Sequence, residues 1–225
     1  MRFLRAFVVL CLCVSATGAD GSGCSFVTQT SAATSPGSLD VEITADDKDD
    51  PIDGEIPVHM LFRLDGKIAE FAAGETVTCN GVSLTYAGLF GYSGSVPQVA
   101  PGGAYEFVYT RKGTAIKILL TAPERPRFTS PLTGTRVQRS NNLRITYVAA
   151  GDESIVGYAG DSTTGQEGSA QPDSGTYTGL DVTKLKAGPG SIGLIRKIVG
   201  TPLRTGFKSA HTTYRVSSSI DITWF

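Results

Sequence analysis

The stretch GETVTCNGVSLTY, residues Gly74 to Tyr86, places an Asn-Gly pair between two short runs that alternate apolar and polar residues. Both central positions of a type I′ turn need a positive φ angle, which Asn and Gly adopt at low cost. The stretch therefore predicts a β-hairpin that turns at Asn80-Gly81. Just upstream, Asp65-Gly66 separates IPVHMLFRL (Ile56 to Leu64) from KIAEFAAG, which predicts a second hairpin.

The same pattern extends on both sides of these hairpins. LDVEIT (Leu39 to Thr44) alternates with a period of two, and Pro101 to Pro123 contains two strand-like runs joined near Lys112-Gly113. The second half repeats the pattern in RITYVAA, SIVGYAG, SIGLIRKIVG and HTTYRVSSSIDITW. Because no window shows an apolar stripe with the 3.6-residue period of a helix, the sequence predicts an all-β fold.

A proline-rich segment divides the chain. PERPRFTSP, Pro123 to Pro131, has three prolines in nine residues, and proline interrupts strand pairing because it has no backbone N–H. We expect a domain boundary here, with one β-sandwich domain over residues 38–122 and a second over residues 123–225.

The N-terminus has the features of a secretory signal peptide. Two arginines, Arg2 and Arg5, accompany the apolar run from Leu4 to Val14, which is too short to span a bilayer. Small residues follow, so we expect residues 1–19 to be a leader cleaved after Ala16 or Ala19. Residues 20–37 have the composition of a flexible tether. No later stretch is apolar and long enough for a membrane span, so the sequence predicts a secreted protein.

The cysteines follow from that leader. Its removal takes away Cys11 and Cys13, and leaves Cys24 and Cys79 in the mature chain. In an oxidising compartment two cysteines most simply form one disulfide. The alternative is a lipid anchor on Cys24 with Cys79 as a buried free thiol. Gly21 stands where a lipidation signal requires a large aliphatic residue, which favours the disulfide.

The second half resembles a known superfamily. TGLDVTKLKAGPGSIGLI (Thr178 to Ile195), the proline-led start PRFTSP and the strand-like end IDITW resemble fibronectin type III and related immunoglobulin-like domains. The resemblance implies two immunoglobulin-like β-sandwiches in tandem and no active site. The cysteine-tryptophan-cysteine core of antibody domains is missing, since the single tryptophan, Trp224, is penultimate.

Charge is nearly balanced but unevenly distributed. Residues 38–122 contain twelve acidic and six basic residues, whereas residues 123–225 contain eight acidic and twelve basic residues. No basic cluster has the density of a nucleic-acid footprint, so a nucleic-acid partner is not expected.

Two letter patterns suggest catalysis or cofactor binding, and neither has the context it needs. GPGSIG (Gly188 to Gly193) matches the dinucleotide fingerprint G-x-G-x-x-G, but a strand-like run follows it instead of a helix, so we expect a turn. GYSGS (Gly91 to Ser95) misses the nucleophile elbow by one position. We expect the two histidines, His59 and His211, to be ordinary strand side chains.

The sequence DDKDDPIDGE, Asp46 to Glu55, is the densest group of charges. Calcium takes six to eight oxygen ligands, so this loop is a candidate calcium site. Pro51 stands where an EF-hand needs a ligand, and a solvated acidic turn is the favoured interpretation. The candidate ligands are Asp46, Asp47, Asp49, Asp50, Asp53 and Glu55. No other cofactor is expected.

Aromatic residues gather near the end of the first half, namely Phe90, Tyr92, Tyr105, Phe107 and Tyr109. The last three alternate along one strand and are expected in the core, although tyrosines on a sandwich face can also stack on sugars. The leading functional hypothesis is a non-catalytic extracellular binding or structural module with a protein or glycan partner. The alternatives are a calcium-assisted carbohydrate-binding module and a secreted hydrolase whose site is assembled from loops.

Overall fold

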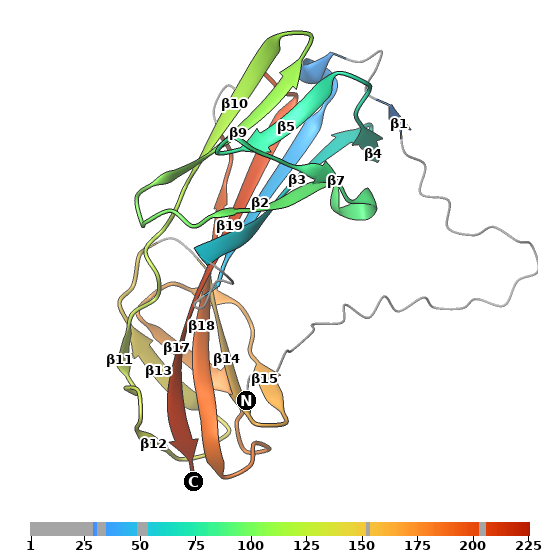
Figure 1. Cartoon of the computed structure of the whole chain (residues 1–225). Coiled ribbons are helices and arrows are strands. Elements are labelled where there is room, and N and C mark those ends of the chain that lie inside the picture. Colours follow the sequence, from blue (N-terminus) through green and yellow to red (C-terminus); the bar gives the residue numbers. More distant parts are fainter. Residues whose placement is uncertain (1–28, 31–34, 49–53, 152–153, 203–205) are drawn as a thin grey trace, which may run out of the picture.

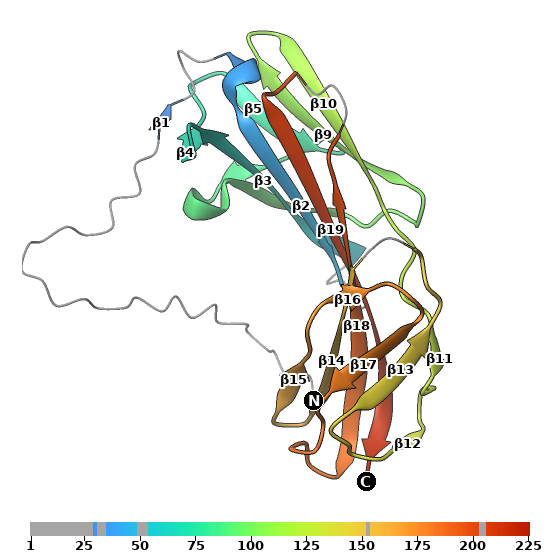
Figure 2. The same ribbon diagram turned by 180° about the vertical axis from the view of Figure 1, so that it is seen from behind.

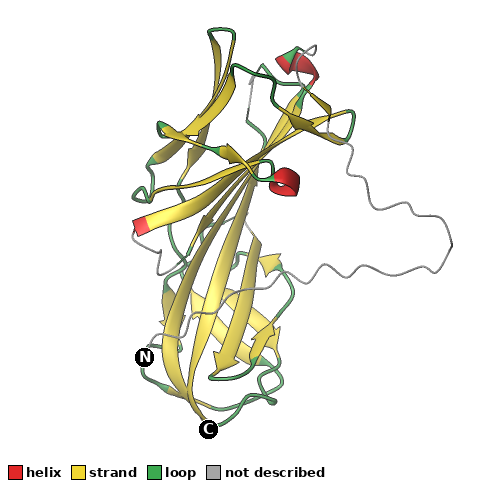
Figure 3. Ribbon diagram, turned by 45° about the vertical axis from the view of Figure 1, so that its right-hand side comes forward, coloured by secondary structure: helices red, strands yellow, loops and turns green. Residues whose placement is uncertain are grey.

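The computed structural model describes residues 29–30, 35–48, 54–151, 154–202 and 206–225. This part of the chain is built mainly from strands, with short 3-10 helices that include η2 (Pro36–Ser38) and η4 (Gly88–Phe90) (Figure 3). The all-β expectation is confirmed. No described helix is both long enough and apolar enough to cross a bilayer.

The strands differ widely in length, from two residues to sixteen. In chain order they are β1 (Gln29–Thr30), β2 (Asp40–Asp47), β3 (Glu55–Leu64), β4 (Lys67–Glu70), β5 (Glu75–Cys79), β6 (Val82–Ser83), β7 (Thr85–Tyr86), β8 (Tyr92–Pro97), β9 (Ala104–Arg111), β10 (Thr114–Thr121), β11 (Phe128–Ser130), β12 (Arg136–Val137), β13 (Leu143–Tyr147), β14 (Ser154–Asp161), β15 (Gly165–Glu167), β16 (Gln171–Pro172), β17 (Thr176–Leu180), β18 (Gly188–Gly200) and β19 (Ser209–Trp224).

The described strands form three sheets, of twelve, four and three strands. The long sheet has the order β1-β4-β3-β2-β19-β18-β14-β15, with β7, β8, β12 and β16 attached to it. The sheet β10-β9-β5-β6 packs on its upper part and β11-β13-β17 on its lower part, as seen in Figure 1. The molecule is therefore a pair of β-sandwiches, here called the first and second lobes, that share one sheet.

The predicted hairpin turns are present. Positive φ angles occur at Asp65 (50°) and Gly66 (78°), at Asn80 (47°) and Gly81 (80°), and at Lys112 (47°) and Gly113 (79°). These pairs join β3 to β4, β5 to β6, and β9 to β10. Three dipeptides that adopt positive φ angles thus form the turns between three pairs of neighbouring strands in the first lobe.

Strand β19 belongs to both lobes (Figure 2). Its first half, Ser209–Val216, pairs in parallel with β2, and its last residues pair with β12. Tyr214 and Val216 are buried in the core of the first lobe, whereas Ile222 and Trp224 are buried in the core of the second. Residues 217–219, three serines that are not buried, fall between the two cores.

This pairing of β2 with β19 crosses the expected boundary at 122/123, and the folding of the separated parts is the test of that expectation. Figure 1 shows the chain leaving the first lobe through the proline-rich segment, returning to it along β18, and running back into the second lobe along β19. Phe207, Ala210, Tyr214 and Val216 pack in the same cluster as residues from β2, β3, β5 and β9. The first lobe therefore draws one of its central strands from beyond residue 122.

The glycine-rich segment Gly188 to Gly193 is not a turn, contrary to the sequence expectation. It is the start of β18, and its glycines make room for aromatic rings: a Cβ at Gly190 would overlap the Trp224 indole, and one at Gly193 would overlap the Tyr158 ring. The Trp224 indole N–H donates to the carbonyl of Gly160 at 3.0 Å. Close packing in the second lobe, not a chain reversal, explains these glycines.

We predict that the fragment 38–122 does not fold alone, because β2 then lacks β19 and the core lacks Tyr214 and Val216. Circular dichroism melts of this fragment should show no cooperative transition, whereas the chain from residue 38 to 225 should melt cooperatively. Adding a synthetic peptide of residues 206–218 should restore structure to the fragment. A cooperative melt of 38–122 without the peptide would instead support an independent domain that ends at residue 122.

Candidate functional site

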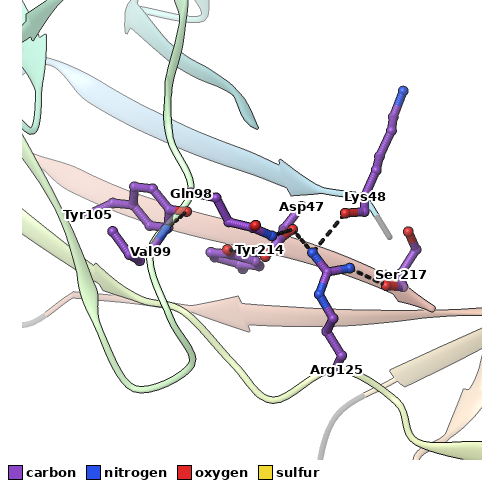
Figure 4. A network of polar contacts seen from close by, with 8 residues as sticks. All are labelled: Asp47, Lys48, Gln98, Val99, Tyr105, Arg125, Tyr214 and Ser217. Carbon is purple, nitrogen blue, oxygen red and sulfur yellow. Dashed lines mark hydrogen bonds and ion pairs between the residues drawn. The ribbon is translucent and has the colours of Figure 1, made fainter. Parts of the chain in front are cut away.

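A network of polar contacts around Arg125 lies at the junction between the lobes (Figure 4). Arg125 is part of the proline-rich segment, and its side chain forms an ion pair with Asp47 at the end of β2. Its Nη1 donates to the carbonyl of Ser217 at 2.6 Å, and its Nη2 donates to the carbonyl of Lys48 at 2.7 Å. One guanidinium thus joins the proline-rich segment to β2 and β19.

Asp47 is 5% exposed and accepts further hydrogen bonds. The side-chain amide of Gln98 donates to its Oδ1 at 2.7 Å, and the Tyr214 hydroxyl donates to its Oδ2 at 3.1 Å. Burial, with Tyr105 and Asp47 beside it, raises the pKa of the Tyr214 hydroxyl, so this hydroxyl remains a donor at neutral pH. The carboxylate is therefore covered by donors on both oxygens.

A second arginine, which is buried, holds the same segment from the other lobe. Arg196 on β18 is 1% exposed, and its Nε donates to Asp173 Oδ2 at 2.7 Å. Its Nη1 donates to the carbonyl of Glu124 at 2.6 Å, and its Nη2 to the carbonyl of Val148 at 2.9 Å. Since Glu124 and Arg125 are adjacent, the proline-rich segment is held from both sides.

A groove lies beside these arginines, with a cavity volume of about 910 Å³. Its apolar lining includes Leu132 and Val148, which are 56% and 42% exposed. Arg127, which also lines the groove, is exposed. The groove thus combines an apolar surface with two exposed residues of opposite charge, Glu124 and Arg127, while the other two arginines that line it are engaged in the ion pairs above.

Sequence reasoning did not find this network. The prolines around Arg125 predicted only a domain boundary. The alternation of residues around Arg196 predicted only a strand. One signal was present: in SIGLIRKIVG the inward positions read Ile192, Leu194, Arg196, so a charge occupies a core position. A buried charge of this kind requires a partner, which the sequence could not name.

The acidic loop is only partly described. Asp46 pairs with Arg215 at 2.6 Å and Asp47 with Arg125, while Glu55 is exposed at the start of β3. The candidates Asp49, Asp50 and Asp53 lie outside the described residues. Within the described ranges no group of three or more His, Cys, Asp or Glu side chains could hold a metal ion. The calcium site stays an untested alternative to a solvated acidic turn, and two of its six candidate ligands already have arginine partners.

Cys79 lies in the core of the first lobe. It is fully buried on β5 and is a free thiol in the structure, and burial raises its pKa to about 12. Cys24 lies outside the described residues. The disulfide between them therefore stays a prediction.

The aromatic residues behave as the alternation predicts. Tyr105, Phe107 and Tyr109 are fully buried, which confirms them as core residues. Tyr92 is also buried and stacks on Phe71 with ring centroids 3.9 Å apart. Phe90, in η4, is 63% exposed. Because Tyr105, Phe107 and Tyr109 are buried, they cannot form a surface on which a sugar stacks.

The histidines lie on the first lobe's part of the long sheet. His59 on β3 is half-buried, and burial lowers the pKa of its imidazole. His211 on β19 is exposed, and it aligns with Glu42 of β2. Each occupies a strand position that alternates with buried neighbours, as expected from the sequence.

Comparison with known proteins finds similarity in structure but none in sequence. No family model matches the chain, and no curated protein matches it. Similar solved structures include the fibronectin(III)-like modules of Clostridium thermocellum CbhA (15% identity, 80% of this chain and 93% of that chain, TM-score 0.26). Others are DIP-gamma IG1+IG2 (11%, 82% and 97%, 0.23) and a chimeric titin Z1Z2-Z1Z2 tandem (12%, 81% and 96%, 0.24). These TM-scores are low, and the β-sandwich fold rests on the strands and sheets described above.

We predict that Cys79 is protected from alkylation in the native protein at about pH 8, because the thiolate is both buried and scarce when the pKa is raised. Iodoacetamide labelling followed by intact mass should show no adduct on Cys79 until the chain is unfolded. Ser83→Cys, at an exposed position on β6, is the control and should label at once. Rapid native labelling of Cys79 would contradict the prediction. If unfolded chain takes up label only after reduction, the disulfide with Cys24 exists.

We also predict that Arg196→Met destabilises the protein by about 3–5 kcal/mol, because it leaves the buried Asp173 carboxylate without its cation. Urea unfolding measures this loss. Arg215→Met is the matched control: its ion pair with Asp46 involves an arginine side chain that is 50% exposed, so about 0–1 kcal/mol is expected.

Adding Asp173→Asn to Arg196→Met should recover part of the loss, since no buried charge then remains unpaired. Equal, small effects of Arg196→Met and Arg215→Met would show that the buried pair does not hold the junction.

Proposed function

We propose that this chain is a non-catalytic, secreted module with a structural or binding role outside the cell. The observation that carries the proposal is that the buried carboxylates at the junction, Asp47 and Asp173, are both paired with arginines. Asp47 and Asp173 each pair with a buried or partly buried arginine, and both arginines also bind backbone carbonyls. These groups connect the lobes to the proline-rich segment.

General acid–base catalysis needs a group that can exchange a proton with a substrate. The carboxylate of Asp47 is covered by Arg125, Gln98 and Tyr214, and Asp173 also accepts from the backbone N–H of Ala150 at 3.2 Å. Proton transfer by either carboxylate would break the network that joins the lobes. The groove beside them is better suited to binding than to chemistry.

The shared sheet supports a structural role. β18 and β19 pair with each other from Gly188 to Gly200 and from Thr212 to Trp224 without interruption. Because both cores pack on these two strands, a change in the angle between the lobes would disturb the ladder. A module of this kind holds its ends at a constant separation, which suits a spacer or a scaffold for contact with a protein or glycan.

The calcium-assisted carbohydrate-binding alternative has less support. Calcium binding by Asp46 and Asp47 would compete with Arg215 and Arg125 for the same oxygens. The alternating aromatic residues of β9 are in the core. The hydrolase alternative would need a site outside the carboxylates of the junction.

We expect the full chain, expressed with its own leader in a secreting cell, to appear in the medium with an N-terminus near Thr17 or Asp20 and no lipid on Cys24. N-terminal sequencing and intact mass measure this. A leader variant with Val8→Arg and Val9→Arg is the control and should remain inside the cell, since it breaks the apolar run.

The purified protein should show no turnover in a panel of hydrolase substrates, and its melting temperature should be the same in calcium as in chelator. Retention of the wild-type chain in the cell would overturn secretion. Turnover would favour the hydrolase, and a calcium-specific rise in melting temperature together with chelator-sensitive binding on a glycan array would favour the carbohydrate-binding module.

A further inference from the structure

Strand β10 (Thr114–Thr121) is the outermost strand of the four-stranded sheet in the first lobe. One of its edges pairs with β9 over its full length, from Thr114 opposite Arg111 to Thr121 opposite Ala104. Its other edge has no strand beside it in the part of the chain that the structure describes. Figures 1 and 2 show β10 along the margin of the first lobe.

The hairpin turn decides which peptide groups point outward. Because Lys112-Gly113 form a two-residue turn, the flanking pair Arg111 and Thr114 is hydrogen-bonded, and the pairs alternate from there. The even-numbered residues of β10 therefore bond to β9, and the odd-numbered residues direct their N–H and C=O groups away from it. No hydrogen bond within the described residues satisfies these outward groups. They belong to Ala115, Lys117, Leu119 and Thr121.

This edge lacks the usual protection against pairing. β10 has no proline, and its register with β9 runs without a bulge. Leu119 on the outer face is 61% exposed. The one charge on the edge, Lys117, is paired with Glu106 of β9 at 3.1 Å, which reduces its ability to repel an approaching strand.

We propose that β10 is a dimerisation strand, which pairs antiparallel with β10 of a second copy of this chain and joins the two four-stranded sheets into one. Two identical antiparallel strands are self-complementary about a two-fold axis, so both edges are used and the assembly closes at two copies. The groups that β10 offers are backbone donors and acceptors along an extended strand, and another extended strand is what fits them.

One register satisfies all the outward groups. With Ile118 on the two-fold axis, Lys117 lies opposite Leu119 of the second copy and Ala115 lies opposite its Thr121, so each outward residue forms a hydrogen-bonded pair. In this register the methylene stem of Lys117 packs on the leucine. Moving the axis to Lys117 would place two ammonium groups opposite each other, which is unfavourable, and would leave Thr121 unpaired.

The first experiment is sedimentation velocity of the mature protein over a range from micromolar to millimolar concentration, where we expect a concentration-dependent dimer. Leu119→Pro should be monomeric over the same range. The N–H of Leu119 points away from β9, so the proline removes an intermolecular donor and leaves the β9 ladder intact. Its circular dichroism spectrum should match that of the wild type, and its melting should match at a concentration low enough for the wild type to be monomeric.

The matched control is Leu119→Ala, which keeps the N–H. We expect it to dimerise, with a dissociation constant raised by no more than about tenfold. A wild-type chain that is monomeric throughout, or a folded Leu119→Pro variant that still dimerises, would overturn the proposal.

A second experiment tests the register and does not depend on the folding of the proline variant. Lys117→Cys and Leu119→Cys are made separately in a Cys24→Ser background, and Cys79 is buried. Hydrogen-bonded antiparallel pairs have Cα atoms about 5.5 Å apart, within the range of a disulfide.

Mild oxidation of an equal mixture should give a covalent dimer that contains one chain of each variant, while each variant alone should stay uncrosslinked. Crosslinking of neither the mixture nor the single variants, or crosslinking of the single variants alone, would overturn the proposed pairing.

Discussion

The parallel pairing of β2 with the first half of β19 is the constraint on which the rest of the structure depends. It completes the first sandwich with a strand from the end of the chain, and it brings Tyr214 against Asp47. Because β19 then continues into the second sandwich, the same strand determines how the second lobe follows the first. The two lobes are therefore built on successive parts of one long sheet. They are not connected by a linker alone.

A shared sheet creates a gap between two cores, and polar groups occupy it. Three serines of β19 pass through this gap. Arg125 of the proline-rich segment donates to the carbonyl of Ser217, and Arg196 donates to the carbonyl of Glu124 in that segment. Desolvating a guanidinium is costly unless its donors are used, so each arginine has a carboxylate and backbone carbonyls as partners. The groove and the outer edge of β10 are two surfaces of the described residues that stay accessible for interaction.

Local patterns in the sequence predicted local features well. The dipeptides Asp65-Gly66, Asn80-Gly81 and Lys112-Gly113 adopt the positive φ angles expected of hairpins, and the alternation of Tyr105, Phe107 and Tyr109 placed them in the core. The glycines of Gly188 to Gly193 were misread as a turn, because their role depends on the rings of Trp224 and Tyr158 on other strands. The acidic loop was read as a group of like charges, whereas the arginines that pair with its first two residues come from far along the chain.

The sequence by itself determined the all-β class, the position of the hairpins and the inward face of the strand that carries Tyr105, Phe107 and Tyr109. These depend on the backbone sterics of two or three neighbouring residues and on a period of two, which can be read without knowing the fold. The tertiary structure alone decided which strands pair, which charges are buried, and which edge stays open. Ser209 donates to Asp40 at 2.6 Å across 169 residues of sequence, and no local pattern specifies a contact of that range. Pairing over such distances is selected by the burial of the whole core, so it appears only when all the strands are packed together.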